Sequence, residues 1–208
     1  MKWREKQEGF AGQRLVVVPR PVLATALQQP LLRHLLPTDA GYYPKAKGHT
    51  CVRKHGCPEV IFIYCAEGNG WCEIAGRRHE IVKNQLLVIN AATSHVYGAD
   101  KKTPWTIHWF HAIGSNVPFY RERLGVTNQK PVVSLGGDVQ LFSLFEDVRE
   151  GLQQGFTLTH LIYAAHSLAH LMGLILRHKE EYWHGETSIR ERIEKSAEFM
   201  QGHLRERL

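Results

Sequence analysis

Hydrophobic and polar residues alternate in short runs through the middle of the chain, from about residue 42 to residue 113. Seven such runs span residues 49–54, 59–65, 70–75, 78–82, 86–90, 94–98 and 105–113. Polar or glycine-containing turns separate them. Many short strands at this spacing are typical of a β-sandwich or β-barrel. A small barrel can hold one small ligand in its interior.

The first forty residues are less regular. Residues 14–18 (RLVVV) predict a short strand. Pro19, Pro21, Pro30 and Pro37 divide the rest, which we interpret as an arm with about one helical turn.

A helical period begins after Pro131. Asp138 is a suitable N-cap for a first helix, and we expect Gly151 and Gly155 to end it. Its apolar face carries Phe142, Phe145, Val148 and Leu152.

A longer helix is predicted from about Leu158 to Tyr182. A heptad-like seam runs along it, made of Leu161, Ala165, Leu168, Met172 and Ile175. A second apolar set consists of Ile162, Ala169, Leu174 and Leu176. Both apolar sets would be buried if the helix packed against the barrel with one set and against a second subunit with the other. The alternative is a helix buried between the barrel and the preceding helix.

Ser188 and Glu191 form a capping-box pattern, which predicts the start of a last helix. Its apolar stripe is still periodic when the chain stops at Leu208. We therefore expect the natural protein to continue beyond this point.

Composition narrows the class of protein. The chain has 208 residues, of which 43% are hydrophobic, and its net charge of +6 is scattered rather than massed in one block. No apolar run approaches the roughly 18 residues of a membrane span, and the N-terminus lacks a signal-peptide pattern. Cys51, Cys57, Cys65 and Cys72 show no zinc or redox spacing, so we expect reduced thiols. These features favour a cytoplasmic globular protein.

The run 105–113 contains the first candidates for ligand binding. Trp105, Ile107, Trp109 and His111 share one face of a strand, and Thr106, His108 and Phe110 share the other. An indole ring can stack on a sugar, and an imidazole can bond to a hydroxyl group. The alternative is that the tryptophans only pack in the core.

Two further runs add polar candidates. His95 and Tyr97 share a strand face, and His49, Cys51 and Arg53 alternate on another strand. An inward-facing Arg53 would bring a planar guanidinium into the barrel, where an arginine is rare unless it is paired or occupied by a ligand. Otherwise Arg53 is a surface residue.

Metal binding is the competing chemistry. Metal-binding cupin barrels carry H-x-H-x3-E and a later histidine, and the corresponding residues here are Arg53, His55, Glu59 and His95. A cation in the first ligand position repels a divalent metal, so a weak set of three remains. His166 and His170 have chelating spacing on the long helix but no third ligand. We expect no catalytic residues, no metal and no cofactor.

Taken together, these residues resemble the ligand-sensing domain of AraC-type transcription regulators. The resemblance lies in Gly41-Tyr42-Tyr43-Pro44, in Arg53 before Gly56, in Ile61-Phe62-Ile63-Tyr64, in Ser94-His95-Val96-Tyr97 and in Pro104-Trp105-Thr106-Ile107-His108-Trp109-Phe110-His111. It covers residues 40 to 114 most closely.

The resemblance implies an α+β fold: a cupin-like β-barrel of the jelly-roll type, followed by a helical segment. It implies an N-terminal arm (1–40), an effector-binding barrel (41–130), a helical dimerisation segment (131–184) and the start of a linker helix (185–208). The linker would lead to a helix-turn-helix DNA-binding domain that is absent here. The expected partners are a sugar-like effector, a second copy of the chain and DNA; the dimer contacts are expected from Leu161, Ala165, Leu168, Met172 and Ile175.

The resemblance also implies ligand contacts. The ligand arginine, tyrosine and stacking tryptophan of the arabinose-sensing member correspond to Arg53, Tyr97 and Trp109. One of its pocket histidines corresponds to Ile107, which argues against arabinose itself, because site groups and ligand hydroxyls must match. His49, His95 and His111 complete the candidate set. The alternative function is a metal-dependent cupin enzyme, an isomerase or oxygenase, that uses His55, Glu59 and His95.

Overall fold

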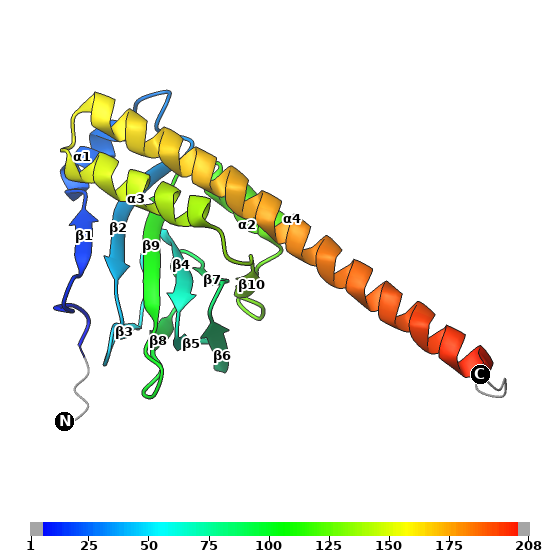
Figure 1. Cartoon of the computed structure of the whole chain (residues 1–208). Coiled ribbons are helices and arrows are strands. Elements are labelled where there is room, and N and C mark those ends of the chain that lie inside the picture. Colours follow the sequence, from blue (N-terminus) through cyan, green and yellow to red (C-terminus); the bar gives the residue numbers. More distant parts are fainter. Residues whose placement is uncertain (1–5, 204–208) are drawn as a thin grey trace.

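Two antiparallel sheets face each other and form the body of the molecule (Figure 1). The computed structural model describes the backbone of residues 6–203 and the side chains of residues 6–182. One sheet has six strands in the order β1-β2-β9-β4-β7-β10, and the other has four in the order β3-β8-β5-β6. The fold is therefore α+β with a cupin-like barrel of the jelly-roll type, as predicted.

The strands of the six-stranded sheet are β1 (Arg14–Val17), β2 (Leu36–Tyr43), β9 (Thr106–Ile113), β4 (Val60–Glu67), β7 (Gln85–Ile89) and β10 (Val132–Ser134). Those of the four-stranded sheet are β3 (Thr50–Arg53), β8 (His95–Ala99), β5 (Asn69–Ile74) and β6 (Arg77–Val82). All seven strand runs from 49 to 113 are confirmed to within two residues at each end, since period-two patterning is local to the strand. The short strand at residues 14–18 is confirmed as β1.

The region before residue 44 contains more regular structure than the sequence pattern indicates. Besides helix α1 (Arg20–Ala26), it contains β2, the second strand of the large sheet. Pro37 and a register shift between Pro37 and Asp39 interrupt the alternation of side chains along β2. An alternating hydrophobic pattern therefore does not reveal this strand. Helix α2 (Val117–Leu124) and β10 were also not predicted.

Helices α3 (Val139–Gln153) and α4 (Leu158–His203) lie across the outer face of the six-stranded sheet (Figure 1). Asp138 caps α3 as expected, because its side chain accepts a hydrogen bond from the backbone N–H of Gln140 at 2.8 Å. Gly151 does not end α3. A Cβ there would lie 2.8 Å from the Tyr163 ring, so this glycine allows α3 and α4 to approach closely.

The expected dimer seam is buried inside the chain. Leu161, Ala165, Leu168, Met172 and Ile175 are each at most 3% exposed and belong to the core between the sheet and the helices. This corrects the expectation that the seam contacts a second copy: an apolar helical stripe has to be covered, and here the same chain covers it.

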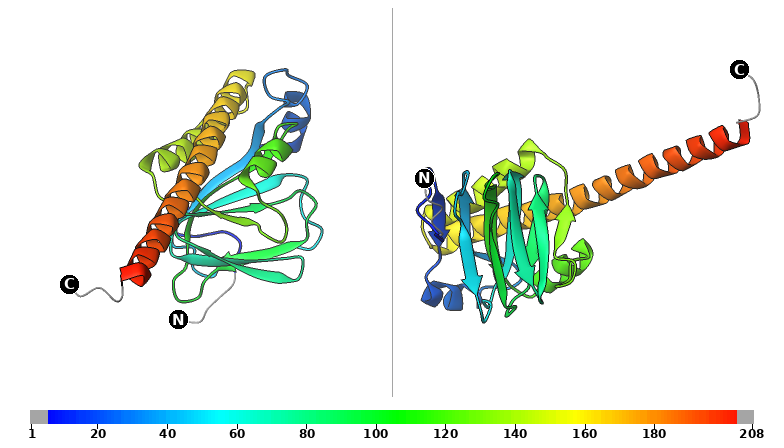
Figure 2. Two further views of the ribbon diagram at one scale, coloured as in Figure 1. Left: turned by 90° about the vertical axis from the view of Figure 1, so that its right-hand side faces the viewer. Right: turned by 90° about the horizontal axis from the view of Figure 1, so that it is seen from below.

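Helix α4 is continuous over 46 residues, or roughly 70 Å at 1.5 Å per residue. The backbone is helical through Ser188, so the predicted helix start there is wrong, while the side chains of Ser188 and Glu191 lie outside those described. The C-terminal half of α4 projects away from the barrel, as two further views make clear (Figure 2).

The segment Leu158–Tyr182 of α4 is long and apolar enough to cross a membrane by length and composition. A core helix of a globular protein passes the same test, and 44% of the apolar window is buried against the rest of the chain. The expectation that no segment approaches a membrane span is therefore wrong by this measure, and the buried part of the segment belongs to the core.

Candidate functional site

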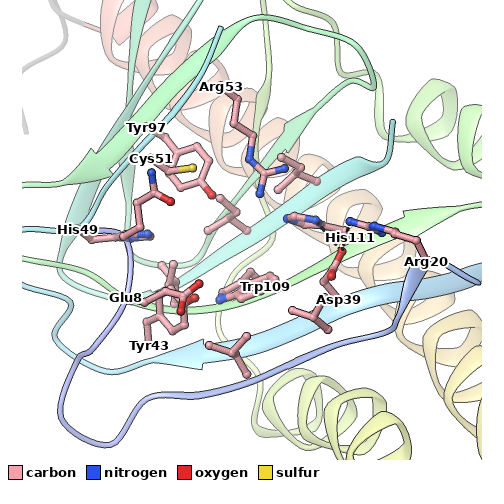
Figure 3. A pocket seen from close by; sticks show the side chains of 16 residues that line it. Glu8, Arg20, Asp39, Tyr43, His49, Cys51, Arg53, Tyr97, Trp109 and His111 are labelled. Carbon is pink, nitrogen blue, oxygen red and sulfur yellow. Dashed lines mark hydrogen bonds and ion pairs between the residues drawn. The ribbon is translucent and has the colours of Figure 1, made fainter. Parts of the chain in front are cut away.

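A cavity of about 240 Å³ lies between the two sheets and opens towards the N-terminal arm (Figure 3). Six of the seven predicted ligand-binding residues line it: His49, Arg53, Tyr97, Ile107, Trp109 and His111. The remaining lining residues are Gln7, Glu8, Leu15, Val17, Arg20, Asp39, Tyr43, Cys51, Ile61 and Ile63. This volume suits a small metabolite, since it is below the roughly 300–1,000 Å³ of sites for drug-sized ligands.

Strand β9 decides which of the candidate residues face the cavity. Ile107, Trp109 and His111 point into the barrel, whereas His108 and Phe110 point to the helices. Trp105 faces inward too, but it is fully buried and does not line the cavity. Alternation along β9 therefore separates the residues on the cavity side from those that pack against the helices.

Arg53 is the half-buried cation of the cavity. Its guanidinium extends inward from β3 (Figure 3). Burial opposes its charge, but Tyr97 and the thiol of Cys51 favour the protonated form and raise the pKa of Arg53 above its ordinary value. Within residues 6–182 no carboxylate forms an ion pair with Arg53.

Trp109 covers one side of the cavity. It pairs in register with Gly41 of β2, and a Cβ at Gly41 would lie 2.6 Å from the indole ring. The glycine therefore allows the ring to lie flat over the neighbouring strand. The indole N–H of Trp109 is buried and has no hydrogen-bond partner among the described residues.

His49 is a neutral lining residue. Burial lowers its pKa to about 4. Its Nδ1 accepts a hydrogen bond from the indole N–H of Trp105 at 3.1 Å, so its proton resides on Nε2.

His95 is the one predicted ligand-binding residue that does not line the cavity. It pairs in register with Arg53 and stacks on Tyr97 with ring centroids 5.8 Å apart. Its Nδ1 donates to the carbonyl of Thr93 at 2.7 Å, and burial lowers its pKa. His95 thus supports Tyr97 and Arg53 rather than forming part of the cavity wall.

An acid–base network that the sequence did not indicate borders the cavity. His111 and Asp39 are cross-strand partners, and Nδ1 of His111 lies 3.1 Å from Oδ2 of Asp39. Burial alone would raise the pKa of Asp39, but His111, together with Thr38 and Arg20, lowers it below its usual value. Arg20 also lies 2.6 Å from the buried carboxylate of Glu59. The network ties α1 to β2, to β9 and to the residue that precedes β4.

The N-terminal arm closes the same opening. Gln7 and Glu8 line the cavity, as do Leu15 and Val17 of β1. Phe10 is buried against Tyr43 and His49. The arm and β1 therefore complete a wall of the cavity. The sequence offered only one signal for this, the predicted strand at residues 14–18 next to a proline-rich arm.

The candidate metal ligands do not come together. His55 is exposed in a turn, while Glu59 is buried and engaged by Arg20. Residues 6–182 contain no group of three or more His, Cys, Asp or Glu side chains placed to hold a metal ion. His166 and His170 are exposed on α4. The four cysteines are free thiols.

A barrel with a partly polar internal cavity, an arm over its opening and a helical layer outside defines a ligand-binding module of the cupin type. The chain matches the family described as the AraC-like ligand binding domain over residues 38–202, and it belongs to that family. It is also 30% identical over 159 residues to the MmsAB operon regulatory protein of Pseudomonas aeruginosa. That match covers 74% of this chain and 51% of the relative, so the chain spans about half the length of that protein.

Solved structures with a similar barrel have low sequence identity to the chain. The cupin domain of Schizosaccharomyces pombe Cnp3 is 10% identical with a TM-score of 0.35, covering 55% of this chain and 71% of that one. A cupin-like protein of Thermotoga maritima is 13% identical with a TM-score of 0.34, covering 53% and 81%. We take no function from these two likenesses.

Proposed function

We propose that the chain is the effector-sensing part of an AraC-type transcription regulator and that it binds a small molecule without catalysing a reaction. The observation that carries the proposal is the cavity between the sheets, into which Arg53, Tyr97 and Trp109 all point (Figure 3). Family membership and the regulatory relative support the same role. A sugar or a related metabolite is the first class of effector to test, since Trp109 offers a stacking surface.

The wider regulator would act on DNA through a separate domain beyond this chain, in the cytoplasm. The proposed arm, barrel, helical and linker segments keep the boundaries given above. The projecting half of α4 would carry the signal towards that domain. An effector regulates only if it binds two states unequally, and the arm over the cavity is the element whose position it would bias.

Dimerisation, if it uses α4, has to use the face that the core leaves uncovered. Leu158 is 49% exposed, and Ile162, Ala169 and Leu176, on the same side of the helix, are half-buried. We propose this face, in place of the buried seam, as the contact between two copies.

The experiment is a thermal-shift screen with monosaccharides, sugar acids and short carboxylic acids, followed by calorimetry on each compound that raises the melting temperature. A ligand that binds only the folded state has to raise its stability. We expect Trp109→Ala to weaken binding by about tenfold or more, equal to about 1.4 kcal/mol. The fold, checked by circular dichroism, should persist.

Trp71→Ala is the matched control. Trp71 is a half-buried tryptophan on β5 that stacks on Arg78 and does not line the cavity. Its loss should leave ligand affinity unchanged. Equal affinity of Trp109→Ala and the wild type would remove Trp109 from the site.

A further inference from the structure

The charges around the cavity are unevenly neutralised. Arg20 is engaged by Glu59 at 2.6 Å and lies 3.8 Å from Asp39. Arg53, deeper in the barrel, has no carboxylate partner among the described residues. A guanidinium that is partly withdrawn from water needs an anion or strong acceptors to offset the lost hydration.

Two side chains that line the cavity offer N–H donors. The buried indole N–H of Trp109 has no acceptor. The Nε2–H of His49 is a donor because its Nδ1 already accepts from Trp105. Oδ2 of Asp39, a potential acceptor, is engaged by Thr38 and His111. A complementary ligand therefore has to supply acceptor oxygens.

Glu8 is the lining carboxylate without such a partner, and it stands on the exposed arm. Water and salt screen a charge in that position far more than one inside the barrel. Its repulsion of an anion at Arg53 is correspondingly weak.

Part of the cavity wall is aliphatic. Leu15, Val17, Ile61, Ile63 and Ile107 contribute to it. A sugar ring has hydroxyl groups around its whole edge, and each one placed against this wall would lose its hydrogen bonds to water at a cost of about 1–3 kcal/mol. A short hydrocarbon body suits the same surface without that cost.

We infer that the effector is a small organic carboxylate with a short aliphatic body: its carboxylate pairs with the Arg53 guanidinium, and Ile61, Ile63 and Ile107 cover its hydrocarbon part. The inference rests on the proposed ligand-sensing function and narrows its effector class. A planar guanidinium matches the two oxygens of a carboxylate in a forked pair. Trp109 and His49 then donate to a further oxygen of the ligand where it has one.

The test compares acids with neutral analogues of the same shape. Butyrate, isobutyrate and lactate are titrated by calorimetry into the wild-type chain beside butyramide, isobutyramide and lactamide, and beside arabinose and galactose as neutral sugars. We expect at least one acid to bind more than about tenfold more tightly than its amide, because only the acid forms a charge-assisted pair.

Variants of Arg53 then test whether its guanidinium is the group that pairs with the acid. Arg53→Gln should weaken binding of that acid by more than about tenfold, and Arg53→Lys should restore part of it, since lysine keeps the charge but not the fork. Arg77→Gln, which changes an exposed arginine on β6 outside the cavity, is the control and should bind as the wild type does. Melting temperatures of all variants verify that they fold.

The outcomes distinguish failure of the carboxylate inference from failure of the proposed sensor function. Equal binding of acids and amides, or binding of a sugar that Arg53→Gln does not alter, would overturn the carboxylate inference and leave the sensor function standing. An acid that binds with full affinity to Arg53→Gln would overturn it as well. If no compound binds and the wider screen finds no ligand sensitive to Trp109→Ala, the inference and the proposed function both fail.

Discussion

The two faces of the six-stranded sheet differ in how completely they are filled. The outer face packs against α3 and α4 in a continuous core, where Phe62 and Phe110 stack with centroids 4.7 Å apart. The inner face meets the four-stranded sheet around the cavity. Both faces come from the same strands, yet one is closed by the chain's own helices and the other leaves room for a ligand.

The polar groups follow the same division. On the outer side, the half-buried Glu146 lies 2.7 Å from the exposed Arg14 and 3.0 Å from the buried Arg149, so its charge is paired. On the inner side, the indole N–H of Trp109 is buried without a hydrogen-bond partner among the described residues. Buried polar atoms are normally satisfied. The outer face is thus filled by the chain's own side chains, whereas the inner face leaves a cavity and an unpartnered donor, as the proposed ligand-binding role requires.

The largest expected effect is a loss of stability caused by a substitution in the core on the outer face of the six-stranded sheet. Leu168 is fully buried in α4, so Leu168→Ala should lower the free energy of unfolding by about 2–5 kcal/mol. Ligand affinity should not change. Urea denaturation and calorimetry measure the two quantities.

Leu158→Ala is the matched control for this prediction, because Leu158 lies on the same helix but is 49% exposed. Its cost should stay within about 0.5 kcal/mol. If Leu168→Ala instead left stability intact and converted a dimer to a monomer in light scattering, Leu168 would face a second copy after all.

The next largest expected effect is a loss of stability at acidic pH, caused by a buried histidine on the outer face of the six-stranded sheet. Burial, together with repulsion from Arg14 and Arg149, lowers the pKa of His108 to about 4. Glu146 does not reverse this, because the two arginines already engage its carboxylate. The unfolded chain binds a proton at His108 near pH 6.5, whereas the folded chain does so only near pH 4. Stability should therefore fall as the pH is lowered through this window, by up to about 3 kcal/mol for this group.

His108→Gln should flatten that part of the pH profile, measured as the free energy of unfolding at a series of pH values. His166→Gln, at an exposed position on α4, is the control and should leave the slope unchanged. Equal slopes for the wild type and His108→Gln would show that the buried imidazole does not govern acid sensitivity.

The smallest effect concerns the rim of the inner face. Arg20→Gln removes the partner of the buried Glu59, but Arg20 itself is 57% exposed, so water reduces the loss. A double-mutant cycle with Glu59→Gln should give a coupling energy of about 1 kcal/mol in urea denaturation. Strict additivity of the two substitutions would show that this ion pair does not hold α1 against the barrel.

Much of the inner face was predictable from the sequence. Trp109, His111 and Ile107 fall on one face of a strand by period two alone, and Tyr97 follows by the same rule. Asp39 was missed because Pro37 and the register shift obscure the alternation of β2. Arg20 and Glu8 were missed because they enter the site from the arm and α1, where no strand period exists.

The sequence by itself determined the strands of the barrel and which side chains share a strand face, because alternation along a strand is a local property of the backbone. The structure decided that the face with Arg53, Tyr97 and Trp109 is the inward one. Only the tertiary structure decided what covers the apolar stripe of α4, since a helical pattern shows that a face is buried and not against which partner. The sheet order β1-β2-β9 likewise brings Asp39 to His111 and the arm to the cavity. Contacts between segments so far apart in the chain leave no periodic trace within either segment.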